Sequence, residues 1–589
     1  MKSLSLFNAV VQKDTEVKNP IILSEYGCVI TPKAIWAKSQ IETYLKSQKL
    51  DSVELNQTFH KSWAKVIDST HGELMFERLL HYITCFLVDK PKYIYLTDEN
   101  LEIENISGEL LLINCYTKAE LIDKCFAMLN SGIALQAETI KDLLNCLTEE
   151  LGYVFNGKET FNNKEATAIL ATDFGVYPEN EVEFLRCIIH QTIGNPLLIK
   201  NPKTINAIKE SDFNPSKLFN NFGLTKLSTI FNRYKPLFLA YKGKCPKVIN
   251  KIAKLSKKNH KPLMQNPLNL VTSRKIIKAD LYWFENAPIF SLLRALIACN
   301  NRKNGQTNFI YRVRNGKSWS KNNESTKNRD ICEYNYNVLI NLIKTRVNLK
   351  ELKVFIPKDV EYGIPTSEKM FIGNVPTGTI ITDDCLSIGA FWKNEWGVTV
   401  LDLSGENENV KIGWDGQMKN EGSLVHSGDI VNAPNGAIEY IRATKDLKDV
   451  TIVKCNNWQG GDEYKFRLVL GKGDDVNKDA MMNPNNVFFQ HECDSKQKEV
   501  TLGLLIPKKD KISFVLVNVS SGNIRTSSNN PISKITQKAI LEQYANSLTL
   551  NALLIELGAT LVEDVENANL DLTFAKLEKD SIMNIFKNK

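Results

Sequence analysis

The segment VHSGDIVNAPNGAIEYI, residues 425–441, places polar side chains between two apolar runs. Asp429 and Glu439 carry carboxylates, which are the ligands that calcium prefers, and His426 and Ser427 lie beside Asp429. A Ser, a His and an Asp also make up catalytic triads, but neighbours in one tight turn rarely reach the required geometry. The segment therefore predicts either a metal-binding loop or a plain hairpin in which Asp side chains cap backbone amides.

A second acidic stretch, GKGDDVNKDAMMNPNN, follows at residues 471–486. Asp475, Asn477 and Asp479 have the spacing that opens an EF-hand loop, but Ala480 replaces the glycine of position six and Asn486 replaces the glutamate of position twelve. The stretch is thus not an EF-hand. Asp475 and Asp479 remain candidate carboxylate ligands for a metal site.

Motifs that identify common enzyme classes are missing from the sequence. It contains no phosphate-binding G-x-x-x-x-G-K-[ST], no zinc-binding H-E-x-x-H and no G-x-S-x-G nucleophile elbow. We therefore expect a protein that is not an enzyme and has no catalytic residues. An enzyme with an unrecognised site remains a third hypothesis, behind a protein that binds other proteins and a protein that binds nucleic acid.

Positive charge is concentrated in the middle of the chain. Residues 232–279 hold thirteen Lys and Arg and no acid, whereas the whole chain has a formal net charge of only +7. Such a run attracts phosphate backbones, and a second basic run, YRVRNGKSWSKNN, follows it. Aromatic residues among the charges (Tyr234, Phe238, Tyr241 and Trp319) could stack on unpaired bases. The alternative is a solvated helix face. The candidate nucleic-acid-binding residues are Arg233, Lys235, Lys242, Lys244, Lys254, Lys257, Lys258, Arg312, Arg314, Lys317 and Trp319.

Composition indicates an ordinary globular protein, with 43% apolar and 24% charged residues. The N-terminal residues do not resemble a secretory signal, and no apolar run is long enough to span a membrane. The twelve cysteines are scattered without a C-x-x-C pair, which favours buried free thiols over disulfides or a zinc site. These features predict a cytoplasmic protein.

The elements that must position these residues change type near residue 350. Apolar residues recur at helical spacing before that point and in short alternating runs after it, and helical spacing returns at the end. The predicted fold is a multidomain α + β protein, in which an α-helical array precedes an antiparallel β-sandwich and a small α or α/β tail. The expected domains are an α-helical domain at 1–230, a basic α-helical domain at 231–352, the sandwich at 353–530 and the tail at 531–589.

The LDLS strand at Leu401–Ser404, followed by a strand with a tryptophan and then by His426–Asp429, resembles the tellurium-resistance TerD family. That family has a V-D-L-D-x-S strand and then H-[ST]-G-D. Asp402 and Ser404 match the second Asp and the Ser, whereas Val400 stands at the first Asp. The resemblance covers residues 356–525. Together with the helical first half, it is similar to a group of large bacterial and phage proteins.

The resemblance implies a calcium-binding β-sandwich with possible ligands at Asp402, Asp429, Glu439, Asp475 and Asp479. Because Val400 replaces the first Asp and the loop after Asp429 holds few acids, we expect the calcium binding to be weakened or lost, and one weak site is favoured over a tight pair. The resemblance also implies a stress- or conflict-response interaction protein, with partners from a tellurium-resistance-type system. The alternative function is binding of RNA or DNA by residues 232–321.

Overall fold

The computed structural model describes most of the 589-residue chain. The residues outside the description are 24–27, 49–69, 71–110, 157, 158, 160, 262–270, 272–277, 279, 281, 283, 286, 313–317, 323–328, 408, 415, 418, 421, 422, 435, 473–485, 520–536 and 587–589. Helices dominate the first half and antiparallel sheets the second, so the predicted α + β class is confirmed. No helix in the described part of the chain is long and apolar enough to cross a membrane.

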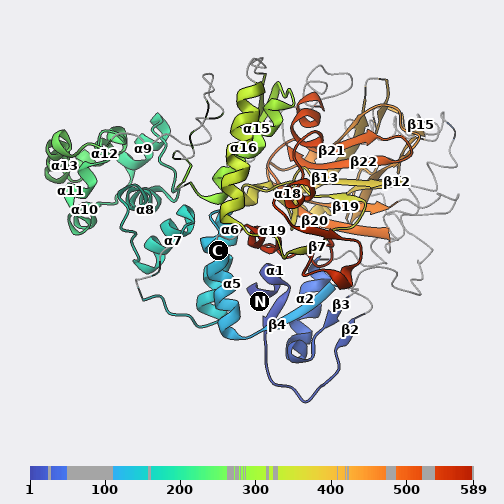
Figure 1. The fold of residues 1–589 in the computed structure, drawn as a ribbon, viewed down its shortest axis with the longest axis horizontal. Helices are drawn as coiled ribbons and strands as arrows, with labels where there is room; N and C mark the ends of the chain where they lie inside the picture. The colour runs from blue at the N-terminus through green and yellow to red at the C-terminus, as the bar shows by residue number, and fades with distance from the viewer. Residues whose placement is uncertain are drawn as a thin grey trace.

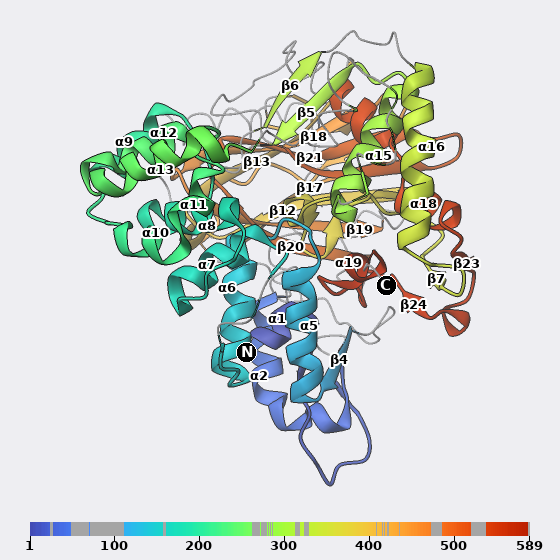
Figure 2. The ribbon, with the colours of Figure 1, turned by 60° about the vertical axis from the view of Figure 1, so that its left-hand side comes forward.

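The first residues form a small α/β unit, drawn in blue at the lower end of the molecule in Figures 1 and 2. Its sheet has the order β1-β4-β3-β2, with β4 parallel to both of its neighbours. The strands are β1 (Ala9–Val11), β2 (Ile21–Leu23), β3 (Cys28–Ile30) and β4 (Leu111–Tyr116), and the helices are α1 (Lys2–Phe7), η2 (Pro32–Ala37) and α2 (Lys38–Gln48). The helices expected at 1–230 are thus joined by a sheet, because most of its strands are too short to give a period in the sequence.

Five of the helices from the first part of the chain pack into the same core as the antiparallel sheets of the second half. They are α5 (Lys118–Asn130), α6 (Ala137–Asn145), α7 (Lys164–Phe174), α15 (Ile289–Lys303) and α16 (Arg329–Arg346). The spacing of Leu121, Cys125 and Met128 puts an apolar stripe on one side of α5, and a capping box of Thr117 and Glu120 fixes its start. Strands β5 (Asn308–Arg312) and β6 (Ser318–Asn322) form a hairpin within the region that was expected to be helical.

A second helical unit has its own core and forms the left-hand end of the molecule in Figure 1. It contains α8 (Glu181–Ile193), α9 (Pro202–Glu210), α10 (Ser216–Phe222), α11 (Leu224–Ser228), α12 (Lys235–Ala240) and α13 (Pro246–Asn259). One apolar cluster runs from Phe184 to Ile252. The unit therefore extends across the boundary that the sequence placed between residues 230 and 231.

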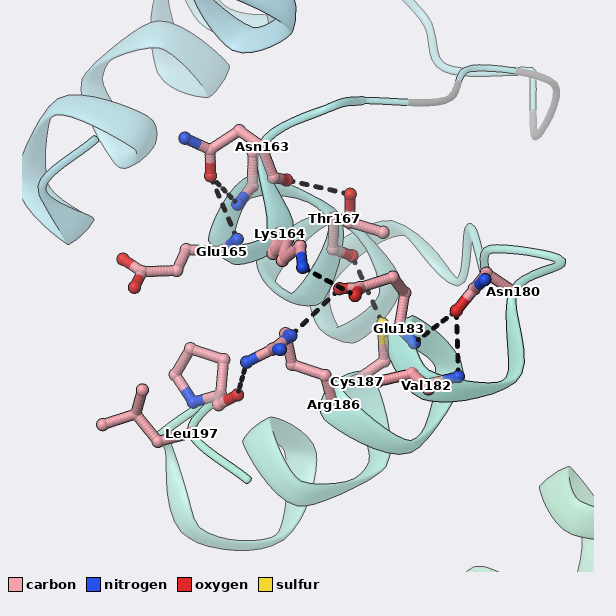
Figure 3. A network of polar contacts seen from close by, with 12 residues as sticks. Asn163, Lys164, Glu165, Thr167, Asn180, Val182, Glu183, Arg186, Cys187 and Leu197 are labelled. Atoms are coloured by element: carbon pink, nitrogen blue, oxygen red, sulfur yellow. Dashed lines mark hydrogen bonds and ion pairs between the residues drawn. The ribbon is translucent and has the colours of Figure 1, made fainter. Parts of the chain in front are cut away.

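Polar contacts join this unit to α7 (Figure 3). The side-chain oxygens of Asn163 and Asn180 accept hydrogen bonds from the first backbone amides of α7 and α8, respectively. Glu183 on α8 forms ion pairs with Lys164 of α7 at 3.5 Å and with Arg186 one turn away at 3.0 Å. The two helices thus begin at defined residues and are held against each other.

Residues 360–519 form two antiparallel sheets that share one apolar core. The seven-stranded sheet contains, in order, β14 (Lys411–Ile412), β13 (Val398–Glu406), β18 (Thr451–Gly460), β21 (Glu499–Pro507), β22 (Ile512–Val519), β11 (Ile380–Asp383) and β8 (Val360–Glu361). The six-stranded sheet contains, in order, β15 (Lys419–Asn420), β16 (Leu424–His426), β17 (Ala437–Thr444), β12 (Cys385–Trp392), β19 (Tyr464–Lys472) and β20 (Val487–Ser495).

The C-terminal residues return to the segment that leads into the sandwich. Strands β23 (Thr560–Val562) and β24 (Leu570–Asp571) flank β7 (Lys353–Phe355) in a parallel three-stranded sheet. Helices α18 (Leu550–Glu556) and α19 (Ser581–Ile585) complete an α/β tail. Residues 353–355, which the sequence assigned to the sandwich, thus belong to the sheet of the tail.

Candidate metal centre

Three carboxylates from separate parts of the sandwich meet between its two sheets. Asp402 lies on β13, Asp429 lies in the loop after β16, and Glu439 lies on β17. One oxygen from each lies within 4.8 Å of the others. Asp402 and Glu439 are 0% and 1% exposed, and Asp429 is partly buried. The structure thus places together three of the five candidate ligands, and we refer to them as the carboxylate cluster.

Glu439 ties the two sheets together through backbone amides. Its Oε2 accepts a hydrogen bond from the Leu403 amide of β13 at 2.7 Å, and its Oε1 accepts one from the Ile430 amide at 2.9 Å. Burial raises the pKa of this carboxyl and the nearby Asp429 charge raises it further, while His426 and the Leu403 amide act in the opposite direction. Neutralising the cluster, by a proton or by a cation, therefore relieves a buried charge.

His426 has a structural role in this arrangement. Its Nδ1 accepts a hydrogen bond from the Gly428 amide at 3.1 Å, which assigns the ring proton to Nε2. Nε2 in turn donates to the Leu403 carbonyl at 3.0 Å and lies 3.5 Å from Glu439 Oε2. Because both ring nitrogens are engaged, His426 offers no lone pair to a metal ion or to a serine hydroxyl.

Ser427 holds the loop against β17. Its Oγ accepts a hydrogen bond from the Tyr440 amide and its own amide donates to the Tyr440 carbonyl, both at 2.9 Å. The side chain is fully buried. Ser427 and His426 thus serve the backbone and do not form a nucleophile and base pair, in keeping with the sequence analysis.

The rest of the loop is fixed by amide side chains and by a glycine. The Ala433 amide donates to Asn394 Oδ1 at 2.9 Å, and Asn394 Nδ2 donates to Asn432 Oδ1 at 2.7 Å. Gly436 has a φ of 100°, and a Cβ there would lie 2.7 Å from the ring of Phe391. These contacts tether the described part of the loop to the residues around Phe391 and Asn394.

Asn456 is a further candidate ligand that sequence reasoning missed. It pairs with Asp402 across β13 and β18, so the two side chains leave the sheet on the same face. Its Oδ1 is buried and accepts no hydrogen bond among the residues that the structure describes. An amide oxygen is a calcium ligand. Only the strand register reveals this position, and no motif marks it.

The other expected ligands contribute nothing that can be placed in the cluster. Asp475 and Asp479 lie within 473–485, outside the described residues. Val400, at the position of the family's first Asp, is a fully buried apolar side chain on β13. The described donors are thus the carboxylate cluster and Asn456. This set fits one hard cation such as calcium, with water needed to complete the six to eight oxygens.

Most of the described nucleic-acid candidates are exposed, including Lys235, Lys242, Lys254, Lys257 and Lys258. Lys244 is instead engaged, because its Nζ donates to the Ile208 carbonyl at the end of α9 at 3.0 Å. Arg233 is partly buried, with its guanidinium carbon 5.0 Å from the centre of the Tyr234 ring. Arg314 and Lys317 lie outside the described residues, as do the side chains of Arg312 and Trp319.

The aromatic residues of the basic run are not available to bases. Tyr234, Phe238 and Tyr241 are 7%, 0% and 0% exposed and belong to the apolar core of the second helical unit. The hydroxyl of Tyr241 is 2.6 Å from that of Thr192. The expectation that these three rings could stack on unpaired bases is therefore wrong, because the core requires them.

Comparisons of the chain with models of protein families, with curated protein sequences and with solved structures returned no match.

Proposed function

We propose that this protein is a non-enzymatic, cytoplasmic interaction protein of a stress- or conflict-response system, built on a TerD-like β-sandwich that binds one calcium ion. The observation that supports the proposal is the meeting of Asp402, Asp429 and Glu439 between the two sheets. Two of these side chains come from the motifs LDLS and HSGD, which carry the resemblance to the TerD family. Its partners would be other proteins of a tellurium-resistance-type system.

The electrostatics of the carboxylate cluster favour a bound cation. Three carboxylates this close repel one another, and the repulsion is strong because the side chains are largely removed from water. A divalent cation replaces that repulsion with attraction. Glu439 Oε1 accepts one backbone hydrogen bond, from the Ile430 amide, and keeps a second lone pair that can face a cation.

A bound ion would also fix the loop that a partner could contact. The ion would link β13, the loop after β16 and β17, which belong to both sheets. Ligand binding of this kind stabilises the folded state according to the ratio of free ligand to dissociation constant. The role proposed for the ion is therefore to order one edge of the sandwich, with no chemical step at the site.

Thermal unfolding of the full chain tests the calcium site. Tryptophan fluorescence reports in part on the sandwich, since four of the eight tryptophans, Trp392, Trp396, Trp414 and Trp458, lie within it. With calcium at ten times the dissociation constant, one site adds about 1.4 kcal/mol, which raises the melting temperature by a few degrees over the sample with chelator. Asp402→Asn removes one charge at nearly constant volume and should abolish the shift.

Asp384→Asn is the matched control, because Asp384 is an exposed acid in the same sandwich. This variant should retain the full calcium shift. Magnesium should shift the melting temperature less than calcium, because it demands a smaller octahedral site. Equal melting temperatures in calcium and in chelator would refute the calcium site, and the loop would then be a hairpin held by backbone contacts.

A further inference from the structure

The second helical unit is the strongly basic part of this chain. Residues 180–261 hold sixteen Lys and Arg against four Asp and Glu, a net charge of +12. Since the whole chain carries +7, the remaining residues together carry −5. The unit lies at one end of the molecule, away from the β-sandwich (Figure 1). A polyanion would therefore be drawn to this end of the protein.

One helix of the unit, α13, carries four of these positive charges in a row along its exposed side. Four exposed lysines of α13 are spaced at i, i+4, i+7 and i+11, which puts them on one side of the helix. The opposite side is buried through Ile249, Ile252 and Ser256. The four residues, called the lysine face below, span about 16 Å along the helix axis at 1.5 Å per residue. They are Lys247, Lys251, Lys254 and Lys258.

The lysine face keeps its charge for an external partner. Within the described residues, no acid forms an ion pair with any of its four lysines. Two of the unit's acids pair elsewhere, since Glu181 binds Lys261 at 3.3 Å and Glu183 binds Lys164 and Arg186. Helix α13 itself contains no acidic residue. The charges of the face are thus exposed, aligned and not neutralised by the described acids.

The burial of three aromatic rings in this unit favours a duplex over a single strand as its partner. Single-strand binders stack bases on exposed aromatic side chains, but Tyr234, Phe238 and Tyr241 are in the core. A duplex needs no stacking and presents one phosphate charge for about every 1.7 Å of its axis. The major groove of B-DNA admits an α-helix, whereas that of duplex RNA is too deep and narrow.

We propose that the lysine face of α13 binds the phosphate backbone of duplex DNA without sequence preference. Lysines supply charge but no paired donors that select a base, so binding depends on the number of phosphates contacted. The inference is independent of the calcium site, because it rests on a different unit of the chain.

Binding of the full-length protein to short DNA duplexes of two unrelated sequences, measured from ~50 to ~200 mM salt, tests the proposal. The logarithm of affinity should fall linearly with the logarithm of salt, with a slope of about −0.9 for each phosphate contacted. The triple variant Lys251→Gln, Lys254→Gln, Lys258→Gln should bind on the order of 10²-fold more weakly at ~0.1 M salt and lower the slope by nearly three.

The matched control is Lys508→Gln, Lys509→Gln, Lys511→Gln, which removes the same charge from the exposed turn between β21 and β22. This variant should bind within about threefold of the parent, and both variants should melt like the parent because exposed lysines contribute little to stability. Equal weakening by the two triple variants would overturn the proposal, as would no binding at ~50 mM salt. Tighter binding to single strands or to duplex RNA would overturn the assignment to duplex DNA.

Discussion

The carboxylate cluster and the lysine face concentrate charge of opposite sign in opposite surroundings. Asp402 and Glu439 are almost fully removed from water, and their positions are set by two sheets and a fixed loop. The four lysines of the lysine face are exposed to solvent on one helix. The effect of the charges inside the sandwich therefore depends on their geometry, whereas the effect of the charges on α13 depends on the number and spacing of the lysines.

This difference explains why the two regions should respond differently to the same kind of change. Removing a buried polar group leaves its partners without hydrogen bonds in a place that water does not reach. Removing an exposed lysine leaves only solvent in its place, so folding is hardly affected. Stability measurements should report on the acidic region, and salt-dependent binding measurements on the basic one.

The largest effect on stability is expected from Glu439→Ala. The substitution leaves the Leu403 and Ile430 amides without their acceptor in the interior, and each buried unsatisfied donor costs about 1–3 kcal/mol. We expect a loss of roughly 2–5 kcal/mol in the free energy of unfolding, measured by denaturant titration followed through tryptophan fluorescence. Lys254→Ala on the lysine face should change the same quantity by less than about 0.5 kcal/mol.

Equal effects of these two substitutions would contradict the contrast between the regions. Glu439→Gln keeps one side-chain oxygen and the volume of the residue, so it should be milder than Glu439→Ala. A Glu439→Gln variant as unstable as Glu439→Ala would mean that one acceptor oxygen is not enough and that both oxygens are needed to hold the sheets together.

The sequence could predict the change from helices to strands and the main parts of the acidic region. LDLS and HSGD are local motifs, and each places one acid of the cluster. The two hydrogen bonds of Glu439 could not be foreseen, because they join residues of different sheets. Asn456 could not be foreseen either, since its place opposite Asp402 follows a register shift beside Val400.

The prediction that three aromatic residues of the basic region stack on bases was wrong for a different reason. Tyr234, Phe238 and Tyr241 are spaced at i, i+4 and i+7, the pattern of a buried helical face, and that pattern outweighs the positive charges around them.

The pairing of β7 with the C-terminal strands joins residues far apart in the chain. No local pattern in either segment specifies such a contact.

A change in pH should have a smaller effect on stability. Raising the pH should destabilise the metal-free protein and should increase the stabilisation that calcium provides. Burial raises the pKa of Glu439 above its ordinary 4.5 in the folded state. In the metal-free protein this carboxyl therefore contributes stability that is fully present below about pH 4.5 and is lost as pH rises through the raised folded value. Calcium requires the ionised form, so its stabilising effect should grow with pH, by at most about 1.4 kcal/mol per unit.

Melting temperatures from pH 5 to pH 8, with calcium and with chelator, measure this competition. The calcium shift should be smallest at pH 5, and Glu439→Gln should remove the part of the pH dependence that this carboxyl causes. A calcium shift that does not change with pH would show that no proton competes for the site, and Glu439 would then not be a ligand.

The smallest effect should come from exchanging lysine for arginine on the lysine face. The variant Lys251→Arg, Lys254→Arg, Lys258→Arg keeps three exposed positive charges, and counterion release depends on how many phosphates are neutralised. Affinity for duplex DNA should stay within about threefold of the parent and the salt slope should not change. The equivalent exchange in the carboxylate cluster, Asp402→Glu, also keeps its charge but adds a methylene to a fully buried position, which costs about 1–3 kcal/mol and should abolish the calcium shift.

Arginine can form paired hydrogen bonds to guanine that lysine cannot form with the same geometry. If the arginine variant gained a preference between the two DNA sequences, α13 would contact base edges within the groove, and the surface would read more than the phosphate backbone.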